Sequence, residues 1–235
     1  MIFDDPGVIA AFSRQRENMS LNYGLTQGAL DNRKNFLNRL NIDYRCLVCP
    51  GQSHSVNIRS VTKKDKGSGA LSYASAIADT DALITNERNL PLAVFTADCL
   101  SVFLYDPLKH VIGLVHAGWK GTADKITAKA VALMQEEFGT NPAGLLAGFG
   151  PAIRQCCYEV SKEFKDCFAY GLEERNGGYF LDLAGINQRQ LVDSGLRQEN
   201  IYDCRKCTFC RSDDFFSFRR EGVKSGRMIS VIMLK

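Results

Sequence analysis

The alternation of apolar and polar positions predicts a β-hairpin near the middle of the chain. Residues 101–105 and 111–115 are rich in β-branched and aromatic side chains, and Asp106-Pro107 between them is a turn signal. Three further strands are predicted on similar grounds, at residues 90–95, 145–149 and 227–234.

Apolar residues at a spacing of three and four predict the helices. Residues 122–138 show this pattern, with Thr122 as the expected N-cap and Gly139 as the expected end. Residues 161–170 and 183–194, each followed by a glycine, are predicted as two more helices. Strands and helices alternate without the regularity of a doubly wound sheet. We therefore predict an α+β fold with a mixed β-sheet core and flanking helices.

Composition and charge favour one compact domain over residues 1–235. The chain is 45% hydrophobic, and no stretch rich in Pro, Gly or Ser divides it. A net charge of +3 is too small to indicate a nucleic-acid partner. No apolar run reaches the ~20 residues of a membrane span, and Asp4, Asp5 and Pro6 are unlike a secretion signal. We expect a cytoplasmic protein without a membrane partner.

Several cofactor and catalytic motifs are missing from the sequence. Gly148-Phe-Gly150 begins like a dinucleotide fingerprint but continues without the third glycine. The sequence contains neither a phosphate-binding P-loop nor the G-x-S-x-G of a serine hydrolase. Chemistry that depends on nicotinamide or ATP is therefore disfavoured.

Cys99 and His116 stand at the two outer ends of the predicted hairpin. If its strands pair, the two side chains meet at one end of the sheet. His54 follows a short apolar run at 46–49 and could join them. Two imidazoles and one thiolate would hold a single zinc ion with its fourth position open, as in catalytic zinc sites. Alternatively, Cys99 could be the nucleophile and His116 the base of a metal-free hydrolase or deamidase.

The other cysteines leave the question of a structural metal open. Nine cysteines without a secretion signal are expected to be mostly reduced thiols. A zinc ribbon formed by Cys46 and Cys49 with the group Cys204, Cys207 and Cys210 would need cysteine pairs 155 positions apart (204 minus 49). The usual spacing between such pairs is ~15–20 residues. Cys46 and Cys49 are expected on a strand, and the region of Cys156, Cys157 and Cys167 is expected to be helical. A purely structural zinc would need a fourth ligand, from His110 or from the 204–210 group.

A series of motifs resembles one known family. They are Thr96-Ala-Asp-Cys99, His116-Ala-Gly-Trp-Lys-Gly121, Gly150-Pro-Ala-Ile153, Tyr158-Glu-Val160 and Phe215-Phe-Ser-Phe-Arg-Arg220, in that order. The chain resembles the YfiH-like family, also called the multicopper polyphenol oxidase or laccase-domain family, over nearly its whole length. Departures are Ser53 and Ser55, where the family often has valine and glycine, and Lys120, where arginine is common.

The resemblance implies a cysteine-hydrolase-like fold and a zinc-dependent purine nucleoside phosphorylase. The implied substrates are adenosine, inosine, guanosine and S-methyl-5'-thioadenosine with phosphate, the products are free base and a ribose 1-phosphate, and adenosine deamination is implied at the same site. Three histidines in the whole chain are too few for several copper ions, so copper is disfavoured. Oligomerisation stays an open option.

The site residues follow from these motifs. His54, Cys99 and His116 are the predicted metal ligands and catalytic residues, and Asp98 is expected to orient one of the imidazoles. Arg33 and Arg219 are the predicted phosphate-binding residues, because they lie within segments that match the family. Only their charge makes Arg59 and Arg220 candidates. Trp119 is predicted either to contact the base or to pack in the core.

Overall fold

The structure is a computed structural model that describes residues 2–14 and 17–235. The strands are β1 (Val8–Phe12), β2 (Ile58–Ser60), β3 (Ala82–Thr85), β4 (Leu92–Thr96), β5 (Leu100–Asp106), β6 (Val111–Ala117), β7 (Leu146–Phe149), β8 (Glu159–Val160), β9 (Leu172–Arg175), β10 (Gly178–Leu181), β11 (Ile201–Asp203) and β12 (Met228–Leu234). The α-helices are α1 (Ala29–Asn38), α2 (Trp119–Ala123), α3 (Ile126–Phe138), α4 (Phe164–Cys167), α5 (Leu183–Asp193) and α6 (Phe218–Glu221).

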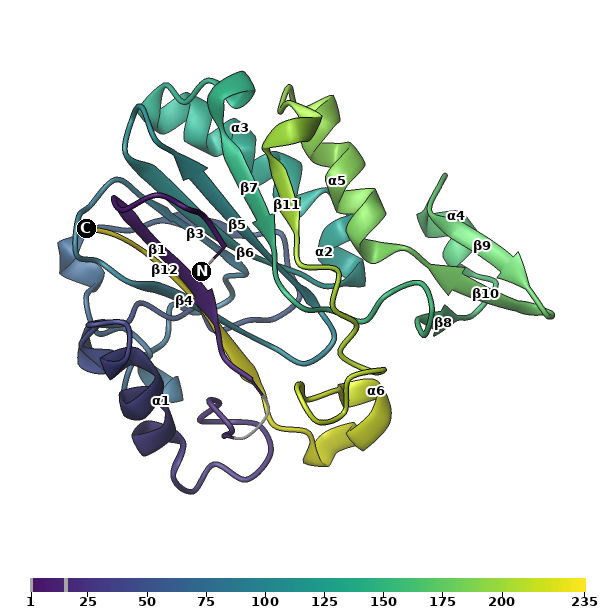
Figure 1. Ribbon diagram of the computed structural model, residues 1–235, viewed down its shortest axis with the longest axis horizontal. Coiled ribbons are helices and arrows are strands. Elements are labelled where there is room, and N and C mark those ends of the chain that lie inside the picture. Colours follow the sequence, from purple (N-terminus) through teal and green to yellow (C-terminus); the bar gives the residue numbers. More distant parts are fainter. Residues whose placement is uncertain (1, 15–16) are drawn as a thin grey trace.

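The strands within these described ranges form three sheets. A mixed six-stranded sheet has the order β11-β7-β5-β6-β3-β2, and an antiparallel three-stranded sheet has the order β1-β12-β4. The third sheet, β8-β10-β9, projects as an arm on the right of Figure 1. The predicted hairpin is confirmed as β5 and β6, with Ser101 opposite His116. This register brings the Cys99 and His116 ends of the hairpin together.

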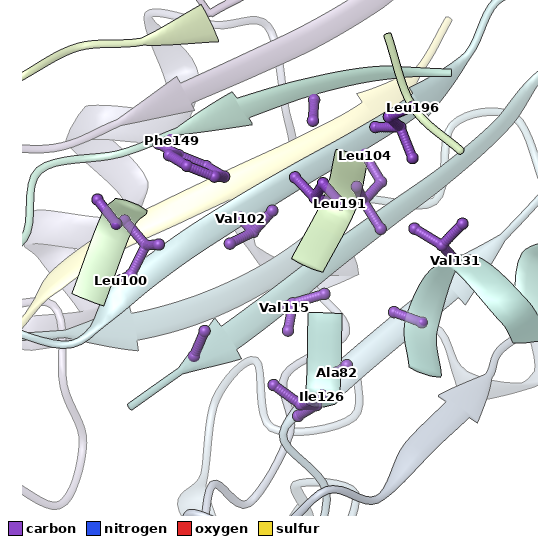
Figure 2. Close-up of a cluster of buried hydrophobic side chains, with 14 of the residues drawn as sticks. Ala82, Leu100, Val102, Leu104, Val115, Ile126, Val131, Phe149, Leu191 and Leu196 are labelled. Atoms are coloured by element: carbon purple, nitrogen blue, oxygen red, sulfur yellow. The ribbon is translucent and has the colours of Figure 1, made fainter. Parts of the chain in front are cut away.

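The central strands of the six-stranded sheet are buried on both faces. Val102 and Leu104 of β5 point to the face covered by α3 and α5, where they join Val115, Val131 and Leu191 in one apolar cluster. Figure 2 shows these side chains between the strands and the helices. The alternate residues of β5 point to the opposite face, as expected for a strand with a period of two.

The opposite face packs against the small sheet. Phe103 and Tyr105 of β5 contact a cluster that includes Val94 of β4 and Ile232 of β12. The outer face of the small sheet is covered in turn by α1, whose Leu37 belongs to a third cluster. Figure 1 shows the resulting order of layers, with α3 and α5 at the top and α1 at the lower left. The predicted α+β fold with a mixed sheet core is thus confirmed.

The predicted helix at 122–138 is divided in two. Thr122 is a buried residue inside α2 rather than an N-cap. The chain breaks at Lys125, which has a left-handed conformation (φ 61°), and α3 begins at Ile126. Gly139 ends α3 as predicted, because it adopts the left-handed conformation (φ 65°) that glycine tolerates best.

Three other predictions of local structure were wrong. Only Phe164–Cys167 of the predicted helix 161–170 is helical, because the surrounding chain belongs to the projecting arm. Cys156 and Cys157 lie in a turn, where the amide of Cys157 donates to the carbonyl of Arg154 at 2.8 Å. Cys46 ends a short 3-10 helix, Tyr44–Cys46, and neither Cys46 nor Cys49 lies on a strand.

Within residues 2–14 and 17–235, no helix is both long and apolar enough to cross a membrane.

Candidate functional site

His54, Cys99 and His116 come from three different parts of the fold and meet at one point. His54 lies in the loop before β2, Cys99 in the turn from β4 to β5, and His116 near the end of β6. One nitrogen from each histidine and the Cys99 sulfur all lie within 4.8 Å of one another. The Cys99 Sγ lies 3.9 Å from His54 Nε2, and the two imidazole rings are 4.9 Å apart between centroids.

This donor set fits a zinc ion. Zn–S and Zn–N bonds of about 2.3 and 2.1 Å in a tetrahedral arrangement place sulfur and nitrogen about 3.6 Å apart. The separation between Cys99 and His54 differs from this value by a few tenths of an ångström, which a small side-chain rotation removes. Three protein ligands leave one position for a substrate or water, as in catalytic zinc sites.

Asp81 organises two of the three residues. Its Oδ1 lies 2.7 Å from Nδ1 of His116, so Nδ1 carries the proton and Nε2 faces the Cys99 sulfur. The same carboxylate accepts the backbone amides of His54 at 3.2 Å and Ser55 at 2.7 Å, together with the Ser55 hydroxyl at 2.8 Å. One fully buried carboxylate therefore fixes both the His116 ring and the His54 loop.

The charges at the site are strongly coupled. Burial alone would raise the pKa of Cys99, but the charge and hydrogen bond of His116 lower it to about 6. Burial opposes protonation of His116, yet the thiolate of Cys99 and the hydrogen bond to Asp81 raise its pKa to about 9. Without metal the imidazolium of His116 therefore sits between two anions, and a bound divalent cation would satisfy the same anions.

Asp98 does not orient an imidazole, contrary to the sequence prediction. Its Oδ1 accepts the hydroxyl of Thr208 at 2.6 Å, and its Oδ2 accepts the hydroxyl of Ser217 at 3.1 Å and the backbone amide of Arg219 at 2.7 Å. Because Asp98 precedes Cys99, these bonds anchor the Cys99 turn to the C-terminal segment. Its backbone is left-handed (φ 86°), which turns its side chain away from the histidines.

Gly118 allows the three residues to come close. A Cβ atom at this position would lie 3.1 Å from the Cys99 sulfur and 3.1 Å from Cδ2 of His54. Gly118 is also the N-cap residue of α2, directly after β6. The glycine of the His116-Ala-Gly motif is therefore required by the close approach of the candidate ligands.

The three residues line a cavity of about 450 Å³. Its walls come from β4, the β4–β5 turn, α2, α6 and the loops around them, and are largely aromatic or aliphatic. The residues of this kind that line it are Tyr23, Tyr73, Phe95, Trp119, Ile153, Tyr158, Leu183 and Phe218. The size and the apolar walls suit a small organic ligand with a planar ring.

Three arginines supply positive charge in the same cavity. Arg33 is as buried as the core residues. It donates Nε and Nη1 to the carbonyls of Met19, Gly69 and Ala70 and so supports the cavity wall. Arg219, an exposed residue of α6, donates Nη1 to the Glu159 carbonyl at 2.7 Å.

Arg227 lines the cavity but was not predicted as a site residue. Its guanidinium lies 4.3 Å from the centre of the Tyr23 ring, and burial lowers its pKa. Asp81 was not predicted as a site residue either. It lies in Asp81-Ala-Leu-Ile-Thr85, a segment that also resembles the family, but nothing in the sequence indicates which of 26 acidic residues faces His116.

The remaining candidates are placed as follows. Trp119 lines the cavity and also packs on Phe164 at 4.9 Å between ring centroids, so both of its predicted roles are compatible with its position. His110 is exposed in the β5–β6 turn, at the opposite end of the hairpin from His116. Arg59 lines a different hollow beside β2 and α3, and Arg220 is taken up by three backbone carbonyls and Glu221.

Sequence comparison finds relatives over most of the chain. The chain is 36% identical to purine nucleoside phosphorylase YlmD of Bacillus subtilis, covering 97% of this chain and 89% of the relative. It is 33% identical to adenosine deaminase RL5 of an unknown prokaryotic organism, covering 88% of this chain and 82% of that protein.

The fold is also found among solved structures, and a family model matches. The crystal structure of YlmD from Geobacillus stearothermophilus superposes with a TM-score of 0.93 at 32% identity, covering 98% of this chain and 93% of that one. Residues 12–235 match the family described as multi-copper polyphenol oxidoreductase laccase. The fold, the order of motifs and these matches agree, and the chain belongs to this laccase-named family.

Proposed function

We propose that this protein is a zinc-dependent purine nucleoside phosphorylase. The observation that carries the proposal is the meeting of His54, Cys99 and His116 in a cavity that also contains arginines and aromatic side chains. Relatives named purine nucleoside phosphorylase support a reaction of this class. The proposed substrates are adenosine, inosine, guanosine and S-methyl-5'-thioadenosine, and residues 1–235 act as one domain.

In phosphorolysis the C1'–N9 bond of the nucleoside breaks and a bond from C1' to a phosphate oxygen forms. The departing base takes up a proton, and the products are free purine and ribose 1-phosphate. The positive charge that develops on the sugar must be balanced by the incoming phosphate, so the protein has to hold both reactants in contact.

The residues around the cavity suit these tasks. We assign the phosphate to Arg219 and Arg227, because Arg219 is exposed and Arg227 half-buried, whereas Arg33 is buried and its Nε and Nη1 bind carbonyls of the wall. The planar base would lie against aromatic walls such as Trp119 and Tyr158. Zinc, when held by His54, Cys99 and His116, supplies a Lewis acid at the floor of the cavity.

Zinc is proposed rather than the copper of the family's name. A multicopper site needs many imidazoles, whereas this chain has three histidines and one of them is exposed at the far end of the hairpin. One thiolate and two imidazoles, with a carboxylate behind one of them, are typical zinc ligands.

Adenosine deamination is proposed as a second activity of the same site. This reaction replaces the 6-amino group of the base by oxygen from water and releases ammonia, so it needs no phosphate. A relative named adenosine deaminase, similar over 88% of this chain, supports it.

One observation favours a different chemistry, that of a metal-free cysteine hydrolase. The pKa of Cys99 is lowered to about 6 by His116, which would keep a thiolate nucleophile available at neutral pH. Zinc content and alkylation of Cys99 together separate the two proposals. A thiolate bound to zinc is protected from alkylation, whereas a free thiolate reacts.

The proposal is tested by incubating zinc-loaded protein with adenosine in the presence and absence of phosphate. We expect adenine only when phosphate is present, and inosine in both cases. Equal release of adenine without phosphate would show hydrolysis instead. Protein that binds no zinc and turns over no purine nucleoside would favour the cysteine hydrolase.

A further inference from the structure

A second group of metal-ligating side chains lies outside the site described above. The sulfurs of Cys156, Cys157, Cys207 and Cys210 all lie within 4.8 Å of one another. Cys210 Sγ is 3.7 Å from Cys156 Sγ and 3.2 Å from Cys157 Sγ. The sequence placed the first pair in a helix and the second pair in a C-x-x-C-x-x-C run, so their convergence is visible only in the fold.

We propose that these four cysteines bind one structural zinc ion. Four thiolates at about 2.3 Å from a tetrahedral zinc are about 3.8 Å apart. The Cys156–Cys210 separation of 3.7 Å is close to this value, and all four sulfurs lie within 4.8 Å of one another. On binding, each thiol gives its proton to solvent, so up to four protons are released for each zinc taken up and no electron is transferred. The four bonds close the coordination sphere, which excludes substrate and makes the site structural.

The local backbone is arranged to bring the two cysteine pairs together. The strands β7 and β11 lie side by side (Figure 1). The segments that follow them run parallel, with a β-bridge between Ala152 and Cys207. The amide of Thr208 donates to the carbonyl of Ala152 at 3.1 Å. Arg154 forms a bidentate ion pair with Asp203 at 2.6 and 2.8 Å. Among the described residues, Cys204 does not belong to the cluster.

Basic groups next to the cluster match the negative charge of such a site. A zinc ion with four thiolates carries two net negative charges. Arg175 reaches from the projecting arm to donate to the carbonyls of Gln155 at 2.9 Å and Cys156 at 3.2 Å. Arg205, Lys206 and Arg211 flank the Cys207–Cys210 pair along the chain.

The position of the cluster indicates what the zinc would stabilise. The segment of Cys156 and Cys157 continues into Ile153 and Tyr158 of the cavity wall, and the segment of Cys207 and Cys210 leads to Arg219. Thr208, next to Cys207, also binds the carboxylate of Asp98 beside Cys99. A zinc ion here would join two wall segments of the active-site cavity that are otherwise about 50 residues apart in the chain.

The test is the metal content of the full chain expressed with added zinc and purified without chelator. We expect two zinc ions per chain for the native sequence and one for Cys99→Ala, which keeps the four-cysteine site. Cys210→Ser should lose one zinc, and Cys204→Ser, a matched change outside the cluster, should keep both. A Cys99→Ala protein without zinc would overturn the proposal, whatever the activity of the native enzyme.

A second measurement covers the case in which Cys210→Ser fails to fold. Cobalt-loaded Cys99→Ala should show the intense thiolate-to-metal charge-transfer absorption of a site with four sulfurs, which one Cys ligand cannot produce. Mass spectrometry of the denatured, alkylated native protein should find all nine cysteines as thiols. A disulfide between Cys157 and Cys210 would overturn the proposal. It would leave these two cysteines without the alkyl group and lower the mass of the protein by two further hydrogens. Colour from bound iron without zinc would overturn the choice of metal.

Discussion

Asp81 holds two of the three proposed ligands with one carboxylate. It binds Nδ1 of His116 and the backbone amide of His54, and the hydroxyl of Ser55 reinforces this arrangement. Ser53 and Ser55 depart from the family's usual residues, yet both donate to Asp81. Burial raises the pKa of Asp81, but the hydrogen bonds and the charge of His116 bring it well below its usual range.

Asp81→Asn should weaken zinc binding by about 10–100-fold. An amide cannot both keep the proton on His116 Nδ1 and accept the amides of the His54 loop. The measurement is zinc affinity by competition with a chelator. Asp106→Asn is the matched control, because this buried carboxylate accepts backbone amides at the opposite end of the hairpin. Unchanged affinity in Asp81→Asn would contradict the role given to Asp81.

Cys99 should react with iodoacetamide at unusually low pH in metal-free protein. Its pKa is about 6 because the charge of His116 outweighs the effect of burial, so the thiolate fraction, and with it the rate, should rise through about pH 6 and then level off. Below that pH the thiol form dominates and the rate falls. The rate is followed by mass spectrometry of the peptide containing Cys99, and zinc should suppress it. A rate that still rises near pH 9 would show an ordinary thiol.

At the scale of elements, the site depends on where β4, β5, β6 and α2 begin and end. The β5–β6 register places Ser101 opposite His116, and Cys99 stands two residues before Ser101. The helix α2 starts directly after β6, which is possible because Gly118 has no side chain to strike the cysteine and His54.

Gly118→Ala should separate the ligands without unfolding the protein. The new methyl group would lie 3.1 Å from both Cys99 Sγ and His54 Cδ2, so one of them must move. We expect a loss of zinc affinity of at least tenfold, measured by the same chelator competition, with little change in the circular dichroism spectrum. Gly144→Ala is the control, because a Cβ there meets nothing within 4 Å. Full affinity in Gly118→Ala would show that the site has room to spare.

The elements also show how far the sequence alone could lead. Periodicity and turn signals are local, so the β5–β6 hairpin and the helix end at Gly139 were predicted correctly. The break between α2 and α3 at Lys125 was not, since nothing local marks a left-handed lysine. Only Phe164–Cys167 of the helix predicted at 161–170 is helical, because this part of the chain connects β8 and β9 of the projecting arm, and the pairing of β8 with β10 joins residues about 20 positions apart.

The same division applies to the site. The convergence of His54, Cys99 and His116 could be predicted because these residues lie near strand ends and Cys99 and His116 lie in motifs. Asp81 and Arg227 could not, because acidic and basic residues are common and only the packed fold selects which of them faces the cavity. The proximity of Cys156 and Cys210 likewise depends on two parallel segments that are distant in the sequence.

At the scale of the whole molecule, the cavity lies where several layers meet. Its floor comes from the end of the six-stranded sheet, and one wall comes from the segment that carries α6 and leads into β12. Asp98 connects these parts through Thr208, Ser217 and Arg219. The proposed metal ligand Cys99, next to Asp98, and the proposed phosphate-binding residue Arg219 are therefore fixed relative to each other.

Arg219→Ala should impair phosphorolysis more than deamination. Loss of one charge-assisted hydrogen bond to phosphate corresponds to about 1.5–3 kcal/mol, or roughly 10–100-fold in kcat/KM for phosphate. Deamination uses water and should change little. Both rates are measured on adenosine by chromatography of adenine and inosine. Arg59→Ala, a change at an exposed arginine outside the cavity, is the control. An equal loss of both activities would mean that Arg219 acts only on the fold of the site.

The central claim is that His54, Cys99 and His116 hold the zinc that phosphorolysis requires. It is tested most directly by a phosphorus-31 NMR time course of adenosine and inorganic phosphate with zinc-loaded native protein and with Cys99→Ala. The account predicts that a ribose 1-phosphate signal grows at the expense of inorganic phosphate with the native protein and is absent with Cys99→Ala. Formation of ribose 1-phosphate at the same rate with both proteins would contradict the claim, and so would its absence with both.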